Sequence, residues 1–133
     1  MEKGNSETGT AIVEITLVLM MLMLIISALI DLGFLMNTRL VLVAAAREGA
    51  RRAAVDGGAS DSAFQTTEEQ LALGQLDPHQ ADIEIRPKQA IYGTPITVTV
   101  RSCYEIMTPF VRAIAGQSIP LQVEVVCRSE KVP

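Results

Sequence analysis

The first third of the chain is dominated by one long apolar segment. Residues 15–30 include no charged residue, and their only polar side chains are Thr16 and Ser27. Apolar side chains would surround a helix on all sides here, so that no polar face is left to meet water. Residues 11–36 are long enough to cross a bilayer, which takes roughly 20 helical residues. The pattern therefore predicts a transmembrane helix.

Two other assignments of this segment are a buried core helix and a cleaved signal peptide. The length of the chain argues against a core helix, because so few remaining residues could hardly wrap it. A signal peptide has an apolar run of ~7–15 residues between a positive charge and a small-residue cleavage site. Here the run is longer, and residues 1–9 hold one Lys and two Glu. We therefore favour the transmembrane helix.

Good helix formers continue beyond the apolar segment. Residues 38–55 are rich in Ala, Leu and Arg. Glu48 stands four residues before Arg52, a spacing that favours a pair of opposite charges on one helix face. Gly57 and Gly58 then predict the end of the helix. We expect a single helix of about 45 residues, or ~65 Å, with half of its length in lipid and half in water.

The remainder of the chain has the composition of an ordinary soluble protein. A second helix is expected from residue 60 or 61 to about residue 76. Strands are expected at 81–86, 96–101 and 121–125, where apolar and polar residues alternate. Residues 104–118 are expected to form a loop with a short helix. The predicted fold class is α+β, with a long transmembrane helix, a second helix and a small, mainly antiparallel three-stranded sheet.

One face of this sheet should pack on the helices and the other should meet water. The polar residues of the strands are expected on the solvent face: Thr97, Thr99, Arg101, Gln122 and Glu124.

The chain contains two cysteines, Cys103 and Cys127. An oxidising compartment would favour a disulfide between them. In a plain hairpin, however, Cys103 lies beside the connection and Cys127 about 20 Å away, well beyond the ~7 Å limit between Cα atoms. A parallel pairing or a bulge would bring them together. A possible disulfide and two free thiols therefore both stay open.

Charge and motifs argue against nucleic-acid binding and catalysis. The net charge is −4, aromatic residues are scarce and there is no Trp, so neither a basic surface nor a stacking platform for bases is expected. The single histidine, His79, follows a proline in a predicted loop. There is no phosphate-binding glycine loop, no G-x-S-x-G and no metal-ligand spacing of Cys and His. We therefore expect that the protein is not an enzyme and that it has no cofactor and no metal site.

Two carboxylates lie near the ends of the apolar segment, Glu14 and Asp31. A charge at the bilayer centre costs roughly 2.5–3.5 kcal/mol, but either side chain could reach the polar headgroups. Asp31 would then lie at the water interface. Its alternatives are a contact with Arg39 or with a neighbouring subunit.

A glycine at position 9, a glutamate five positions later and a long apolar helix resemble the cleavage and assembly signal of type IV pilins. The closest resemblance is to the TadE-like minor pilins or pseudopilins of tight-adherence (Flp) pilus systems. It rests on GTAIVEITLVL at 9–19, AAAREGARRAA at 44–54, ITVTVRSCY at 96–104 and LQVEVVCRSE at 121–130. It implies a pilin-like fold with a leader at 1–9, the long helix at 10–57 and a soluble domain at 58–133.

The resemblance also implies cleavage of the Gly9–Thr10 bond by a prepilin peptidase. Thr10 would then carry a new α-amine, with a pKa near 8, one helical turn from Glu14. In a bundle of parallel helices, the Glu14 carboxylate of one subunit can pair with the amine of its neighbour. Each of the two charges is costly alone in a low dielectric, and pairing offsets that cost.

The partners implied by the resemblance are the inner membrane, prepilin peptidase, other pilin or pseudopilin subunits and the pilus-assembly platform. The soluble domain would be periplasmic, with an extracellular filament as a further location. Arg39, Arg47, Arg51 and Arg52 follow the span, whereas only Lys3 precedes it. The positive-inside rule alone would leave the domain in the cytoplasm. We favour the periplasmic orientation because the resemblance covers several separate segments. A membrane-anchored accessory or binding protein, neither processed nor assembled, is the alternative function.

Overall fold

The computed structural model describes residues 3–132, with side chains from residue 9 onward. Met1 and Glu2, the first two positions of the expected leader, lie outside the described residues, as does Pro133. The elements are α1 (Lys3–Asp56), α2 (Asp61–Leu73), the 3₁₀ turn η1 (Pro78–Gln80), β1 (Asp82–Arg86), β2 (Pro95–Glu105), α3 (Pro109–Ala115) and β3 (Ser118–Arg128).

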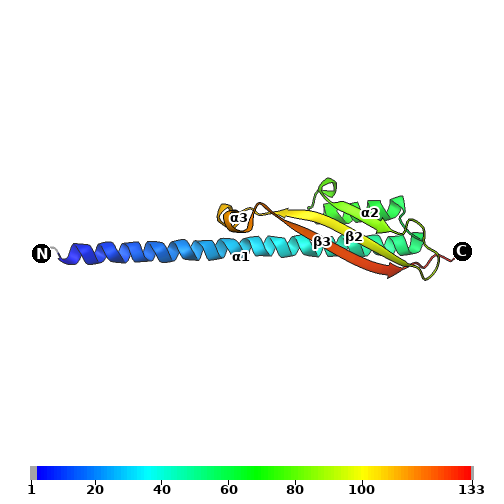
Figure 1. Cartoon of the computed structure of the whole chain (residues 1–133). Coiled ribbons are helices and arrows are strands. Elements are labelled where there is room, and N and C mark those ends of the chain that lie inside the picture. Colours follow the sequence, from blue (N-terminus) through cyan, green and yellow to red (C-terminus); the bar gives the residue numbers. More distant parts are fainter. Residues whose placement is uncertain (1–2, 133) are drawn as a thin grey trace.

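Helix α1 is the axis of the molecule. It has 54 residues, about 81 Å at 1.5 Å per residue, and is longer than predicted because it begins before the expected leader ends. Its first half projects alone, while its second half carries the folded domain (Figure 1). Gly57 and Gly58 adopt φ of 80° and 130°, and both donate their N–H to the carbonyl of Ala53. The predicted helix end is therefore confirmed.

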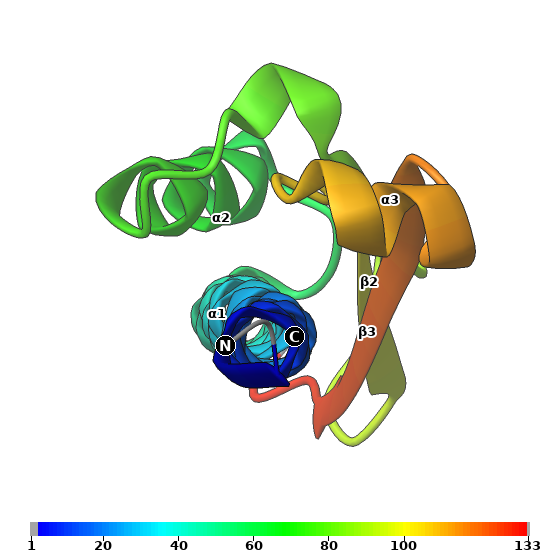
Figure 2. The same cartoon turned by 90° about the vertical axis from the view of Figure 1, so that its left-hand side faces the viewer.

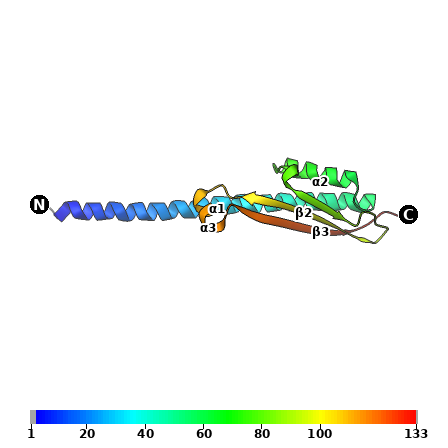
Figure 3. The same cartoon turned by 45° about the horizontal axis from the view of Figure 1, so that its top comes forward.

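The domain places α1 between α2 and the sheet. Viewed along α1, α2 lies on one side, and β2 and β3 lie on another (Figure 2). The view from above shows the strands running along α1, with α3 at the end of the domain nearest the projecting half (Figure 3). The sheet is antiparallel with the order β1-β2-β3. The predicted α+β class with one three-stranded sheet is confirmed.

The core is built from small residues of α1 and branched residues of the sheet. Alternate residues of β2 face α1, since Ile96, Val98 and Val100 are fully buried. Leu71 from α2 completes the contact. The residues that α1 contributes to this cluster are Leu42, Ala45, Ala46, Ala50 and Ala53.

Several predicted boundaries and one predicted exposure need correction. β2 and β3 are both longer than expected, so that the loop between them shortens to residues 106–117, and α2 ends at Leu73. Thr99, predicted to face solvent, is buried. It occupies the central strand, directly between Glu84 of β1 and Glu124 of β3. These longer side chains flank it on the outer face, which explains why a short polar residue there is shielded from water.

Candidate functional site

The surface of α1 between Gly9 and Asp31 is apolar and uncovered by the rest of the chain. Its large apolar side chains, from Ile12 to Ile30, are exposed around the whole helix. The helix is long and apolar enough to span a membrane, and none of its most apolar 18 residues is buried by the rest of the protein. A core helix would be covered, so the alternative of a buried core helix is wrong. This surface needs lipid or other protein subunits around it.

Polar side chains within the span form hydrogen bonds to the backbone of their own helix. The Thr16 hydroxyl donates to the carbonyl of Ile12 at 2.8 Å, and the Ser27 hydroxyl donates to that of Met23 at the same distance. Both are bonds to the preceding helical turn. Neither side chain requires water, so the stretch between Glu14 and Asp31 is compatible with hydrocarbon.

The expected processing site lies within the first turns of α1. Gly9 and Thr10 are helical and exposed, and a Cβ on Gly9 would meet no described atom within 4 Å. Glycine weakens a helix by roughly 0.5–1 kcal/mol relative to alanine. No described atom therefore crowds the Gly9–Thr10 bond at Gly9, and the glycine makes local unwinding of the helix easier.

Glu14 is an exposed residue of the same helical surface, one turn beyond Thr10. The rise of an α-helix puts it about 26 Å from Asp31 along the axis, close to the ~30 Å thickness of bilayer hydrocarbon. The two carboxylates thus lie at the two ends of the uncharged stretch of α1. They differ in environment, because Glu14 is exposed and Asp31 is only 5 % exposed.

Asp31 is covered by the connection between β2 and α3. Its Oδ1 accepts hydrogen bonds from the Tyr104 hydroxyl and the Met107 backbone N–H, both at 3.3 Å. Oδ2 is buried beside Thr108 without a well-formed hydrogen bond to the described residues. Within the described chain, Asp31 therefore bonds the folded domain, and the alternative contact with Arg39 is not formed.

Tyr104 is suited to this contact. Burial raises the pKa of its hydroxyl, and the neighbouring Asp31 carboxylate raises that pKa further. The hydroxyl therefore stays protonated and donates to the carboxylate. Sequence reasoning missed this pair because 73 positions separate the two residues, and no local pattern connects them.

Two glycines, Gly49 in α1 and Gly74 at the end of α2, allow the two helices to pack closely. A Cβ on Gly49 would lie 2.1 Å from the Oγ1 of Thr67, and one on Gly74 would lie 2.2 Å from a methyl of Val41. Neither glycine can gain a side chain unless α2 moves or its partner side chain shifts. The small residues of AAAREGARRAA thus form the surface on which α2 and the sheet approach the helix axis.

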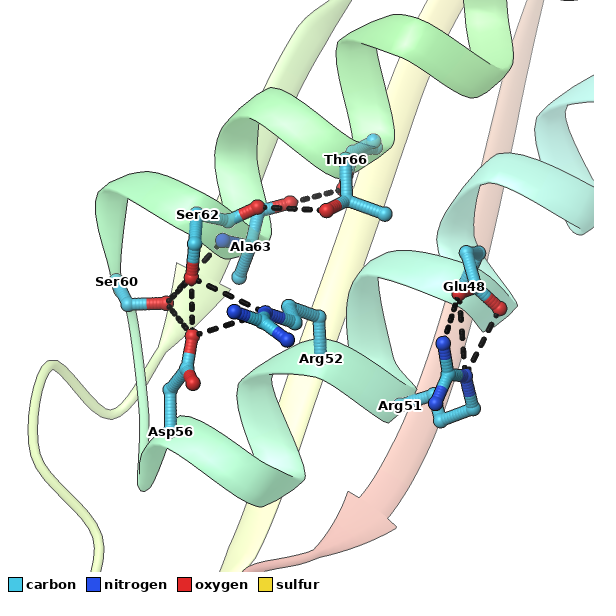
Figure 4. A network of polar contacts seen from close by, with 9 residues as sticks. Glu48, Arg51, Arg52, Asp56, Ser60, Ser62, Ala63 and Thr66 are labelled. Carbon is cyan, nitrogen blue, oxygen red and sulfur yellow. Dashed lines mark hydrogen bonds and ion pairs between the residues drawn. The ribbon is translucent and has the colours of Figure 1, made fainter.

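Two arginines of this segment, Arg51 and Arg52, form polar contacts with nearby side chains (Figure 4). Arg52 lies 3.5 Å from Asp56, and its guanidinium donates to the Ser62 hydroxyl at 3.3 Å. Glu48 pairs with Arg51, so the predicted pairing of Glu48 with Arg52 is wrong. Arg52 is instead drawn to the N-terminus of α2, where oxygens of two serines and Asp56 converge.

Asp56 joins the end of α1 to the start of α2. Its Oδ2 accepts from the Ser60 hydroxyl at 2.6 Å and also from the Ser62 hydroxyl. These hydrogen bonds hold the pKa of the carboxyl below its ordinary value, and Arg52 and Lys131 add to the effect. Ser60 also caps α2 by accepting from the Ala63 N–H. Hydrogen bonds among Asp56, Ser60 and Ser62 therefore stabilise the corner between α1 and α2.

The structure keeps the two cysteines apart. Cys103 is opposite Pro120 at one end of the β2–β3 hairpin, and Cys127 is opposite Ile96 at the other. Both are free thiols in the described part of the chain. Cys127 donates to the carbonyl of Ala50 at 3.1 Å, and burial raises the pKa of its thiol. Cys103 is exposed.

The described residues contain no group of three or more His, Cys, Asp or Glu side chains arranged to hold a metal ion. The features that stand out are therefore a bare apolar helix, two carboxylates at its limits, and a domain packed on its second half.

Comparison with known proteins found one family that the helix resembles. A family model described as TadE-like protein matches residues 9–51. No curated protein and no solved structure matches the chain. The matched segment begins at Gly9 and includes both carboxylates and Gly49. The match indicates a likeness to a pilus-associated family, and the apolar N-terminal helix is long enough for a single membrane span. The expected resemblance to TadE-like proteins is thus confirmed for residues 9–51.

Proposed function

We propose that the protein is a minor pilin or pseudopilin, released from its leader by prepilin peptidase and then assembled into a tight-adherence-type pilus or a related secretion apparatus. The observation that carries this proposal is the bare apolar surface of α1 between Glu14 and Asp31, in a segment with a TadE-like match. Such a surface suits two successive environments, lipid before assembly and neighbouring helices afterwards.

Cleavage between Gly9 and Thr10 is the first step of the proposal. It is supported by the exposure of both residues and by the open space around Gly9. The peptidase must reach a bond that the helix shields, and a glycine lowers the cost of local unwinding. The product begins with the α-amine of Thr10.

Subunit contact through Glu14 is the second step. In the uncut chain the carboxylate is exposed on an apolar helix. After cleavage, the amine of a neighbouring subunit supplies a positive charge at the same depth. A paired carboxylate and amine cost less in a low dielectric than two separate charges. Glu14 therefore favours helices that pack side by side with their N-termini aligned.

The soluble domain is proposed to lie in the periplasm, with α1 in the inner membrane. The arginines that oppose this orientation are partly neutralised, since Arg51 pairs with Glu48 and Arg52 with Asp56. Arg47 lies about 24 Å beyond Asp31 along α1. A C-terminal fusion to a phosphatase that folds only in the periplasm should be active, and a fusion active only in the cytoplasm would contradict this orientation.

Variants separate processing from assembly. Gly9→Leu should retain the leader, whereas Gly33→Leu, the same change at another open position of α1, should be processed. Glu14→Gln should be processed but not incorporated into pilus fractions, with Glu68→Gln on α2 as the exposed control. Normal incorporation of the Glu14→Gln chain would refute the pairing. A chain that is never processed or incorporated would instead be a membrane-anchored accessory protein.

A further inference from the structure

An apolar patch lies on α3 and the connection that precedes it. Its residues are Met107, Phe110 and Ile114, whose side chains are 70 %, 58 % and 81 % exposed. These three side chains form the apolar patch. α3 is the part of the folded domain nearest to the projecting half of α1 (Figure 1, Figure 3). Water is a poor environment for three large apolar side chains at one tip of a small domain.

Hydrogen bonds to Asp31 fix the position of this patch along α1. The Met107 N–H and the Tyr104 hydroxyl both donate to the Asp31 carboxylate. α3 is therefore held beside the residue that ends the apolar span. Since Glu14 and Asp31 are about 26 Å apart along the helix, a bilayer that accommodates the span has its boundary at the level of Asp31.

The apolar surface of α1 continues past Asp31 into the same layer. Leu32, Phe34 and Met36 are all exposed, although they lie beyond the carboxylate. The patch on α3 thus adds to apolar surface that already borders the span. Two polar groups at this level bond within the protein: Arg112 donates to the carbonyl of Ile106 at 2.6 Å, and the Tyr104 hydroxyl donates to Asp31.

We propose that α3 is an interfacial membrane segment, whose patch enters the headgroup and acyl boundary of the bilayer that α1 crosses. Short apolar segments in this layer bury their side chains about 5–10 Å deep without spanning. Burial of the patch removes apolar area from water, which is favourable. The contact fixes the domain at one depth and restricts its tilt relative to the membrane. Continuity with the exposed surface of α1 favours lipid over a second subunit as the occupant.

This inference rests on the proposed membrane anchor, and the test separates the two. The chain has no Trp, so that one introduced indole reports a single site. Three full-length variants are reconstituted in phosphatidylcholine vesicles: Phe110→Trp for the patch, Met21→Trp for the middle of the span and Tyr92→Trp as the control. Tyr92 is also exposed and lies beside Val55, about 36 Å beyond Asp31 along α1.

Lipids brominated at shallow or deep acyl positions then quench the indole by contact. We expect blue-shifted emission and shallow quenching at position 110, deep quenching at position 21, and neither effect at position 92. Quenching at 21 without quenching at 110 would overturn the interfacial role of α3 and leave the anchor intact. A blue shift at 110 without lipid quenching would assign the patch to a second subunit and also overturn it. The absence of quenching at 21 would refute the anchor itself.

Discussion

A side chain on Gly49 would collide with Thr67. The two residues belong to α1 and α2, and a Cβ on Gly49 would lie 2.1 Å from the Thr67 Oγ1 and 3.3 Å from its Cβ. Thr67 is fully buried, and its hydroxyl donates to the carbonyl of Ala63. This contact determines how closely the two helices approach, and it gives the glycine in AAAREGARRAA a structural role.

Gly49→Ala should therefore destabilise the domain, although alanine is the better helix former. We expect a loss of about 1–3 kcal/mol, typical of an overpacked core, measured by thermal unfolding of the full chain in detergent micelles. Gly33→Ala, where no described atom lies within 4 Å of the added Cβ, should be neutral or stabilising. Adding Thr67→Ala to Gly49→Ala should recover part of the loss. Purely additive effects of the two substitutions would contradict the collision.

Removal of the Tyr104 hydroxyl should weaken the attachment of α3 to α1. Tyr104→Phe deletes one donor to Asp31 and leaves the carboxylate with fewer partners, at a cost of about 1 kcal/mol. Hydrogen exchange at the Met107 amide, the second donor to Asp31, should become faster. Tyr92→Phe is the matched control at an exposed tyrosine and should change neither quantity. Equal exchange in the two variants would show that the Asp31 contact does not hold the connection.

Acid should loosen the corner between α1 and α2 by protonating Asp56. The hydrogen bonds from Ser60 and Ser62 lower the pKa of this carboxyl in the folded state. Its contribution to stability is therefore fully present above about pH 5 and is lost as the pH falls through the lowered folded-state pKa. Asp56→Asn should lower the melting temperature at pH 7, and the difference from the unaltered chain should narrow towards pH 2–3. Glu68→Gln should not reproduce this pH dependence, and a difference that grows on acidification would contradict the assignment.

The two thiols should stay separate and react at different rates. Cys103 is exposed, whereas burial raises the pKa of the Cys127 thiol and lowers its thiolate fraction. Alkylation of the folded chain under non-reducing conditions should modify Cys103 first and Cys127 only slowly. A peptide that links Cys103 to Cys127 in the mass spectrum would contradict the strand register.

The sequence was informative where one local pattern decides the structure. The uncharged run before Asp31 predicts the bare half of α1, Gly57 and Gly58 predict its end, and alternation predicts the strands. Contacts between distant segments were not predictable in this way. The pairing of Asp31 with Tyr104, the burial of Thr99 and the collision of Gly49 with Thr67 all depend on which elements meet in space.

The charged residues of α1 show the same limit within a single helix. Spacing alone favoured Glu48 with Arg52, but the Arg52 side chain reaches the start of α2 and contacts Asp56 and Ser62. Helical spacing allows several partners for a charged side chain, and the position of α2 determines which of them Arg52 contacts. The roles proposed for Gly9, Thr10 and Glu14 depend on a peptidase and on other subunits, and they remain predictions.

Assembly of α1, as proposed, depends on cleavage of the Gly9–Thr10 bond. The most direct measurement is the intact mass of the protein purified from cells with and without an active prepilin peptidase. We predict a chain that begins at Thr10 when the peptidase is active, and a chain that begins before the Gly9–Thr10 bond when it is absent. The same uncut N-terminus in both kinds of cell would contradict cleavage by the peptidase.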